Sequence, residues 1–338
     1  MNRWWIFWLL AAAFVWLIVS SFAEIKGIAE LLIKGNGQWI LVAALLQAAY
    51  FTVFTVMFWF AFKAVEVKSR INELLPLTFG SQFVNTIAPT WGMGGVALFV
   101  DDLSSRGQSP ARATAGTILA QISDYVSFAF VLALSLGYLY IQQELKDYEI
   151  IGALLMLLVL CGLSISLLLG MFRPTLLVRM LSLAQRGIRS LACRIKHKPL
   201  LGDGWASQNA NDFIDAAKTI EEHPWRLART LGTALSAHLI NIASIYALFL
   251  AYHNPISIGP LIAGYAIGIL FWNISPVPQG IGLVEGVMAI AYNSLGVHGT
   301  TATVVVLAFR GLDFWLPMLL GFFLLRRAKI FGSMGKKA

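Results

Sequence analysis

Apolar segments long enough to cross a lipid bilayer recur along this chain of 338 residues. An α-helix needs about twenty apolar residues to span the hydrocarbon core. Six segments meet that requirement: 4–22, 39–62, 113–140, 150–172, 227–252 and 301–325. Apolar residues make up 58% of the chain and charged residues 12%, a balance that excludes an ordinary water-soluble globule. The sequence therefore predicts an all-α polytopic membrane protein with about six transmembrane helices.

Two further apolar regions, 74–100 and 258–295, are each cut in the middle by proline and glycine. Neither half of either region is long enough to span. The second region contains NISPVPQGIGLVEG at 273–286, which places helix breakers and a carboxylate at membrane depth. Irregular backbone is tolerated there only where protein buries it or where it lines a water-filled cavity. We therefore expect two re-entrant helical hairpins, at 72–110 and 256–300.

The distribution of lysine and arginine predicts the orientation, because both residues accumulate on the cytoplasmic side of a membrane. We place the N-terminus inside, keep 4–22 as a spanning helix rather than a cleaved signal peptide, and return both hairpins to their starting faces. In this arrangement nearly all lysines and arginines lie on the cytoplasmic side. The exceptions are Lys26, Lys34 and Lys146, which lie outside, and Arg310, which lies within the membrane. Reading both interrupted regions as full spans keeps this asymmetry, whereas reading only one that way does not. We expect both termini in the cytoplasm, at a bacterial inner membrane.

The chain is expected to form a single membrane domain over 1–338, divided into three parts. Residues 1–172 form the first half, 173–225 a cytoplasmic amphipathic connector, and 226–338 the second half. The apolar face of the connector suits a helix lying on anionic headgroups, or a solvated helix packed on the bundle. It has no room for a nucleotide-binding or catalytic domain. The net charge of +8 is thus a signal of topology, and no nucleic-acid partner is expected.

The two halves carry an internal repeat. At one constant offset Pro89 aligns with Pro278, Gly107 with Gly296, Ala113 with Ala302, and Asp124 with Asp313. The same offset superposes an interrupted region, a turn and a long span with a carboxylate near its middle. Because the first copy starts from the cytoplasm and the second from outside, the repeat is expected to be inverted. Inverted repeats with interrupted helices are frequent in secondary transporters, whose substrate sites lie near the membrane midplane.

Ionisable residues deep in the last span indicate where such a site lies. Arg310 and Asp313 are far from either end of 301–325, and a charge at this depth needs partners. Their spacing of three places them on one helical face, and Glu285 is the other carboxylate available. We predict that Arg310, held by Glu285 or Asp313, binds an anionic headgroup such as phosphate. The alternative is a structural ion pair that fixes the second hairpin against the last helix.

Further polar residues and glycines complete the candidate site. The predicted substrate-binding residues are Glu285, Arg310, Asp313, Gly280, Gly282, Asn273, Asp124, Gln121 and Asn85. In the first half, satisfied polar packing is the competing interpretation. His238 and Asn241, one turn apart, are expected to form hydrogen bonds across helices. Neither cysteine belongs to a ligand spacing and no catalytic or nucleotide motif occurs, so we expect no catalytic residues, metal or cofactor.

At these residues the chain resembles a known family. The stretch SPVPQGIGLVEGVMAIAYNSLGV followed by FRGLDFWLPMLLGFF resembles the C-terminal signature of the lysylphosphatidylglycerol synthase transmembrane-domain family, also called flippase-like domain proteins and including UPF0104-type integral membrane proteins. Its N-terminal signature appears as NTIAPTWGMGGVALFVDDLSSRGQSPARATAGTILAQISDYVSF. The resemblance covers 5–327. It implies a polytopic domain associated with lipid translocation, without the cytosolic aminoacyl-tRNA-dependent transferase that two-domain members carry.

The first half departs from the family pattern. Where members commonly have Gly-Glu followed by an arginine, this chain has Gly95-Val96 and then Leu98 and Phe99. The Glu-Arg pair common on the next span is replaced by Ala120-Gln121. We therefore expect the surviving headgroup site in the second half.

The leading functional hypothesis is movement of an anionic lipid or lipid-linked intermediate across the inner membrane. We expect a transporter-like protein rather than an enzyme. Its expected partner is a membrane lipid or a polyprenyl-linked substrate, with a homo-oligomer or lipid-synthesis enzymes as further candidates. Two alternatives stay open: a membrane-embedded transferase acting on a lipid-linked sugar, which would use Asp101 and Asp102, and a non-transporting scaffold of a lipid-synthesis complex.

Overall fold

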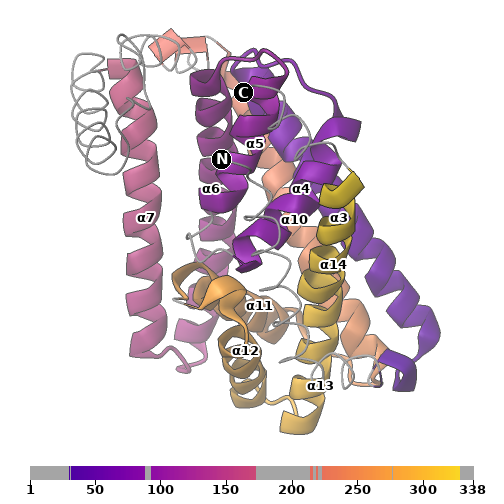
Figure 1. Ribbon diagram of the computed structural model, residues 1–338. Coiled ribbons are helices and arrows are strands. Elements are labelled where there is room, and N and C mark those ends of the chain that lie inside the picture. Colours follow the sequence, from indigo (N-terminus) through magenta and orange to yellow (C-terminus); the bar gives the residue numbers. More distant parts are fainter. Residues whose placement is uncertain are drawn as a thin grey trace, which may run out of the picture.

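The computed structural model describes residues 30, 32–87, 93–172, 214–215, 218–219, 223–275 and 277–327. These residues are helices and their connections, without a strand among them (Figure 1). Four helical stretches are long and apolar enough to cross a membrane: α3 (Gly37–Ala64), α6 (Pro110–Ile141), α10 (Pro224–Ala251) and the continuous stretch Gly299–Leu324. The all-helical class is confirmed, and these four stretches coincide with four of the predicted spans.

The other two predicted spans are 150–172 and 4–22. Helix α7 (Asp147–Phe172) coincides with the predicted span 150–172 and is apolar over Glu149–Ile165. The predicted first span, 4–22, lies outside the described residues, as do both termini and most of the connector 173–225. The orientation of the termini therefore stays a prediction.

Helix starts follow from local sequence. Asn36 caps α3, where its side chain accepts a hydrogen bond from the amide of Gln38 at 3.0 Å. Ser109 caps α6 by accepting from the amide of Arg112 at 3.4 Å, with proline at the first helical position. Such side chains satisfy amides that have no partner inside the helix, and proline fits there because it has no amide hydrogen to leave unpaired.

Both interruptions predicted from the sequence are present. Helices α4 (Ile71–Ile87) and α5 (Met93–Ser105) occupy the first interrupted region and pack on one another. Helices α11 (Ile258–Ile274) and α12 (Leu283–Ser294) occupy the second, with the short turn η1 (Pro278–Gly280) between them. Each of these helices is shorter than a bilayer crossing requires.

The backbone explains why the second region breaks where it does. Ser275 is extended (φ −64°, ψ 130°), as expected of a residue before proline. Gln279, Gly280 and Gly282 then have φ values of 54°, 65° and 80°. These values lie in the left-handed region, which glycine occupies freely and other residues rarely. The turn therefore requires its glycines, and Gln279 is held in an uncommon conformation.

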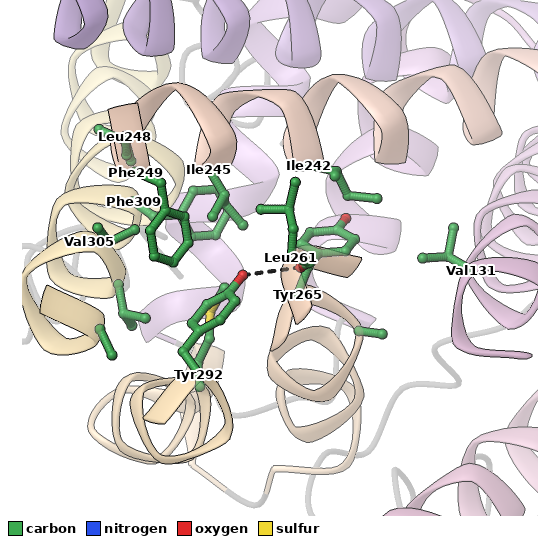
Figure 2. Packing of buried hydrophobic residues seen from close by; sticks show 14 of the residues in the cluster. Val131, Ile242, Ile245, Leu248, Phe249, Leu261, Tyr265, Tyr292, Val305 and Phe309 are labelled. Atoms are coloured by element: carbon green, nitrogen blue, oxygen red, sulfur yellow. Dashed lines mark hydrogen bonds between the residues drawn. The ribbon is translucent and has the colours of Figure 1, made fainter. Parts of the chain in front are cut away.

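An apolar cluster holds the second region in place. Tyr292 of α12 donates a hydrogen bond to the carbonyl of Leu261 on α11 at 3.2 Å, and its ring meets that of Phe249 on α10 edge-on (Figure 2). Tyr265 and Phe309 belong to the same cluster. Since Tyr292 and Tyr265 are fully buried, α12 has a defined position against α10 and α11.

The two halves also pack directly on one another. The end of the last span, α14 (Leu316–Arg327), lies against α4 of the first half. Gly321 makes this approach close: a Cβ atom there would fall onto the carbonyl oxygen of Phe79. Small residues allow such close approach between membrane helices.

We predict that Gly321→Leu destabilises the protein by about 1–3 kcal/mol or more, because the added side chain forces α14 away from α4. The matched control is Gly137→Leu on α6, where nothing lies within 4 Å of an added Cβ atom. Thermal unfolding of the detergent-purified protein checks the difference. Equal melting temperatures for the two variants would show that the contact between α14 and α4 is loose.

Candidate functional site

Arg310 ends α13 (Gly299–Arg310), in the middle of the last span, with 3% of its surface exposed. Its Nε donates to Oε1 of Glu285 at 2.6 Å, and its Nη2 donates to the backbone carbonyl of Gln279 at 2.9 Å. The guanidinium also lies over the ring of Phe314, 4.6 Å from the ring centre. The predicted pairing of Arg310 with Glu285 is therefore observed.

Glu285 reaches Arg310 because of where α12 begins. The helix starts at Leu283, so Glu285 is in its first turn, where the helix dipole favours a negative charge. Its carboxylate is buried, and Oε2 has no hydrogen-bond partner among the described residues. The carboxylate thus has one oxygen bound to Arg310 and one that can still accept a donor.

Gln279 connects this ion pair to the rest of the molecule. While its carbonyl binds Arg310, its Oε1 accepts from the indole of Trp272 at 2.7 Å. Its Nε2 donates to Oε1 of Gln82 on α4 at 3.3 Å. One residue with a left-handed backbone therefore joins the last span, the second interrupted region and the first.

Asp313 does not pair with Arg310 in the described contacts, although the sequence left that pairing open. Residues Gly311–Trp315 form a π-helix, which has more residues per turn than an α-helix. The angle between the side chains of Arg310 and Asp313 consequently differs from the one that a regular helix predicts. The carboxylate of Asp313 is attracted by the charge of Arg310 without an ion-pair contact, and it interacts with Asn241 on α10.

A buried polar network joins Asp313 to Asp124. His238 of α10 lies between Asp124, whose Oδ1 is 3.3 Å from Nε2, and the hydroxyl of Tyr265, which is 2.8 Å from Nδ1. Asn241, one turn further along α10, interacts with both Tyr265 and Asp313. Of the two carboxylates that align in the internal repeat, Asp124 thus meets His238 and Asp313 meets Asn241, one turn further along α10.

The network extends to α3 through Gln47. Its Nε2 donates to Oδ1 of Asn241 at 2.7 Å and to the hydroxyl of Ser244 at 3.3 Å. The hydroxyl of Ser244 in turn donates to the carbonyl of Ala43 at 3.2 Å. His238 and Asn241 do form hydrogen bonds across helices, as the sequence predicts.

The other predicted polar residues form contacts within their own helix or with the neighbouring helix in the chain. Asn85 accepts from the amide of Gly95 at 2.7 Å, which ties α4 to α5. Asn273 donates to the carbonyl of Ile269 on its own helix, and Gln121 interacts with Tyr125. In the described contacts none of these three side chains is bonded to Arg310 or Glu285.

Sequence reasoning did not select Gln47, Tyr265 or Gln279. Gln47 had a usable signal, because a lone amide inside an apolar span usually finds a partner on another helix. The sequence signal for Tyr265 and Gln279 was weaker. Tyrosine is also common as an apolar core residue, and the carbonyl that Gln279 offers to Arg310 depends on its backbone conformation.

Comparison with known proteins shows the family to which the chain belongs. The family model described as the lysylphosphatidylglycerol synthase TM region matches residues 4–321. The chain belongs to this family. The match includes both interrupted regions and the last span up to Gly321, so Glu285 and Arg310 lie inside the lysylphosphatidylglycerol synthase TM region.

Three similar proteins are described as UPF0104 membrane proteins. The one from Methanocaldococcus jannaschii is 20% identical over 318 residues, covering 93% of this chain and 92% of the relative. That from Pyrococcus horikoshii is 22% identical over 314 residues, covering 90% and 91%. That from Methanothermobacter thermautotrophicus is 19% identical over 300 residues, covering 87% and 86%. With its apolar helices, this family member is a multi-pass membrane protein.

We predict that Glu285→Gln and Arg310→Met each destabilise the protein by about 3–5 kcal/mol, because either change leaves one buried charge without its partner. The double variant should lose less than the sum of the two, since it removes both charges. Thermal unfolding of the four proteins measures this coupling. Additive losses would mean that the two side chains do not interact.

A second prediction concerns the polar network. Tyr265→Phe should destabilise the protein by about 1–3 kcal/mol, because the ring nitrogen of His238 loses its buried partner. Tyr246→Phe on α10 is the control, since the side chain of Tyr246 is 38% exposed. Melting temperatures provide the comparison. A Tyr265→Phe protein as stable as the control would show that the hydroxyl contributes nothing.

Proposed function

We propose that this protein moves a lipid with a phosphate-bearing, anionic headgroup between the two leaflets of its membrane. The observation that carries the proposal is the buried ion pair between Arg310 and Glu285 beside an irregular turn. A charged pair at such depth is expensive, and ionisable residues inside membranes commonly mark the path of a substrate. Membership in the lysylphosphatidylglycerol synthase TM region family supports a flippase-like role.

The unused hydrogen-bonding positions of the pair suggest what the headgroup carries. The described contacts of Arg310 use Nε and Nη2, which leaves the Nη1 donors for a phosphate oxygen. Glu285 has an unpaired Oε2 that would accept from a hydroxyl or ammonium group. A headgroup with both a phosphate and such a donor would satisfy the hydrogen-bonding positions of both residues.

The proposed architecture places this pair near the membrane midplane. It consists of six spans, two re-entrant hairpins formed by α4 with α5 and by α11 with α12, an inverted repeat, and cytoplasmic termini at an inner membrane. The order of two short helices followed by a long span, seen in α4, α5 and α6, returns in α11, α12 and the continuous stretch Gly299–Leu324 that begins with α13. Transporters with interrupted helices in inverted repeats bind substrates where the repeats meet.

The structure corresponds to a closed state of the proposed pathway. The side chains of Arg310 and Glu285 are 3% and 9% exposed, so a headgroup reaches them only after a rearrangement. The π-helix at Gly311–Trp315 and the left-handed Gln279 flank the pair and are the proposed hinges. Alternate opening toward each leaflet would then carry the headgroup across.

The transferase alternative has less support in the side chains. Asp101 and Asp102 were its acidic candidates, but Asp102 is buried and its Oδ2 lies 2.7 Å from Nε of Arg106. A carboxylate held in this way is poorly placed as an acid or base for a lipid-linked sugar. The scaffold alternative is decided by measuring transport.

We predict that Arg310→Lys lowers lipid translocation at least about tenfold, because a lysine keeps the charge but loses the planar donor pair that binds phosphate. The measurement uses proteoliposomes with fluorescent phosphatidylglycerol or phosphatidylcholine and a quencher outside the vesicles. Arg229→Lys is the matched control, since Arg229 is an exposed arginine beside Trp225.

Translocation is expected for phosphatidylglycerol in the wild-type and control proteins and to be weak for phosphatidylcholine. A folded, correctly inserted Arg310→Lys protein with wild-type rates would remove Arg310 from the pathway. A wild-type protein that moves neither lipid faster than empty vesicles do would favour the scaffold.

A further inference from the structure

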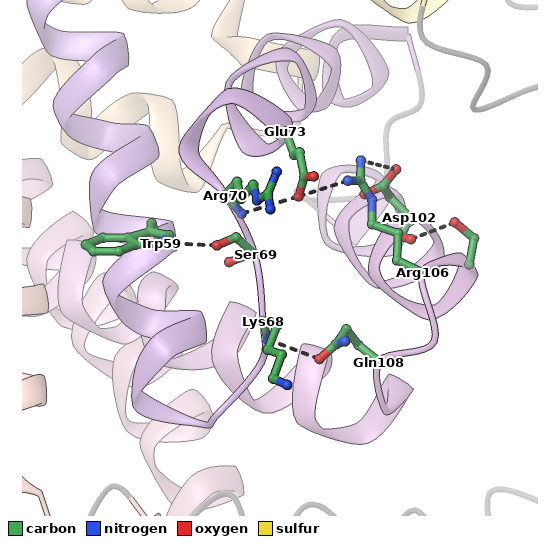
Figure 3. Close-up of polar contacts among 9 residues, drawn as sticks. Trp59, Lys68, Ser69, Arg70, Glu73, Asp102, Arg106 and Gln108 are labelled. Atoms are coloured by element: carbon green, nitrogen blue, oxygen red, sulfur yellow. Dashed lines mark hydrogen bonds and ion pairs between the residues drawn. The ribbon is translucent and has the colours of Figure 1, made fainter.

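A second cationic site lies where α3, α4, α5 and α6 meet. A cavity of about 1030 Å³ is found there, which is at the upper end of the range typical of small-molecule sites, about 300–1,000 Å³. Figure 3 shows polar contacts among residues around it. Two carboxylates line it, those of Glu66 and Glu73. Five cationic side chains also line it: Lys63, Lys68, Arg70, Arg106 and Arg112. The cavity therefore has an excess of positive charge. It shares no lining residue with the pair of Arg310 and Glu285.

Three successive residues of its wall form hydrogen bonds with residues of α3, of α4 and of the connection between α5 and α6. The amide of Lys68 donates to Oε1 of Gln108 at 3.0 Å, and the carbonyl of Ser69 accepts from the indole of Trp59 at 3.2 Å. The amide of Arg70 donates to Oε2 of Glu73 at 3.3 Å. These three hydrogen bonds, drawn as dashed lines in Figure 3, restrain the connection between α3 and α4. A site with a fixed backbone needs little ordering when a ligand binds.

The cations of the cavity fall into two groups. Arg106 lies 2.7 Å from Asp102 and 2.9 Å from Glu73, so its charge is compensated within the protein. Arg112 is likewise paired with Glu66. By contrast, the side chains of Lys63, Lys68 and Arg70 form no ion pair with the residues that the structure describes. Of these three, Lys63 places its ammonium group 4.9 Å from the ring centre of Trp59.

Ser69 provides an independent indication of a ligand. Its hydroxyl oxygen is buried in the cavity wall and has no hydrogen-bond partner among the described residues. Buried hydroxyl groups in folded proteins are nearly always paired, because leaving one unpaired is costly. The unpaired hydroxyl stands between two of these cations, Lys68 and Arg70. A ligand with several acceptor oxygens would satisfy all three residues.

We propose that this cavity binds a phosphate group, with Lys68, Ser69 and Arg70 as its ligands. Arginine binds phosphate through two parallel hydrogen bonds, and lysine contributes a mobile point charge. The cationic residues of the cavity are among those that the charge distribution assigns to the cytoplasmic face, and Trp59 suits the membrane boundary. Both the headgroup of an anionic lipid and a free phosphate compound have the required chemistry.

The test measures binding to the full-length, detergent-purified protein. The probes are dioctanoyl phosphatidic acid, dioctanoyl phosphatidylcholine and inorganic pyrophosphate, each titrated at low salt. The double variant Lys68→Ala/Arg70→Ala should raise the dissociation constant for phosphatidic acid about a hundredfold, since each charge-assisted contact is worth about tenfold. The control variant, Lys34→Ala/Lys146→Ala, also removes two positive charges, at positions that do not line the cavity. It should change the dissociation constant less than about twofold.

A single variant separates binding from folding. Ser69→Ala should leave the stability of the unliganded protein unchanged or raise it slightly, because it removes an unpaired buried hydroxyl. It should also weaken binding of phosphatidic acid by about three- to tenfold. A structural role for the hydroxyl would move stability and leave binding unchanged, which would overturn the assignment of Ser69.

The three probes distinguish the source of the phosphate. Tight binding of phosphatidic acid with weak binding of pyrophosphate supports a lipid headgroup, and equal binding of both supports a free phosphate compound. Equal binding of phosphatidic acid and phosphatidylcholine overturns the proposal. So does an unchanged dissociation constant in Lys68→Ala/Arg70→Ala, or an equal loss in the control variant. Because Arg310 is intact in every variant, these results do not depend on the proposed transport.

Discussion

The contact between Arg310 and Glu285 sets the arrangement of the second half. An arginine in the middle of a membrane span must find a counter-charge, and the nearest carboxylate sits at the start of a helix that cannot itself span. The turn before that helix therefore has to bring Glu285 and the carbonyl of Gln279 to the guanidinium together. The turn does so with left-handed backbone at Gln279, Gly280 and Gly282.

The same turn explains how the two halves are coupled. The side chain of Gln279 bonds to Gln82 on α4, and α14, which follows Arg310 in the chain, also packs on α4. A displacement of the ion pair would thus shift the first half through two separate contacts. The polar network around His238 and Asn241 adds a third link, since it joins Asp124 of one half to Asp313 of the other.

The described apolar spans, both interruptions and a carboxylate partner for Arg310 could be predicted from the sequence, which left open whether Glu285 or Asp313 is that partner. Each follows from a large cost, either an unpaired backbone or an unpaired charge in hydrocarbon. The features that could not be predicted depend on smaller free-energy differences. The π-helix turns Asp313 toward Asn241, and the carbonyl of Gln279 binds Arg310 only because of one left-handed residue. Both are local choices of backbone that residue types alone do not determine.

The two proposed sites differ in a way that suits successive binding. Lys68 and Arg70 are unpaired and exposed, so a phosphate gains attraction there without displacing a partner, and in water it can leave again. Arg310 is already neutralised by Glu285, so a phosphate arriving at its Nη1 donors meets a buried pair without net charge and is repelled by the nearby carboxylate. A headgroup that brings its own donor for Glu285 removes that obstacle. The chemistry of the inner pair, rather than the overall positive charge, would therefore select which anionic lipid crosses.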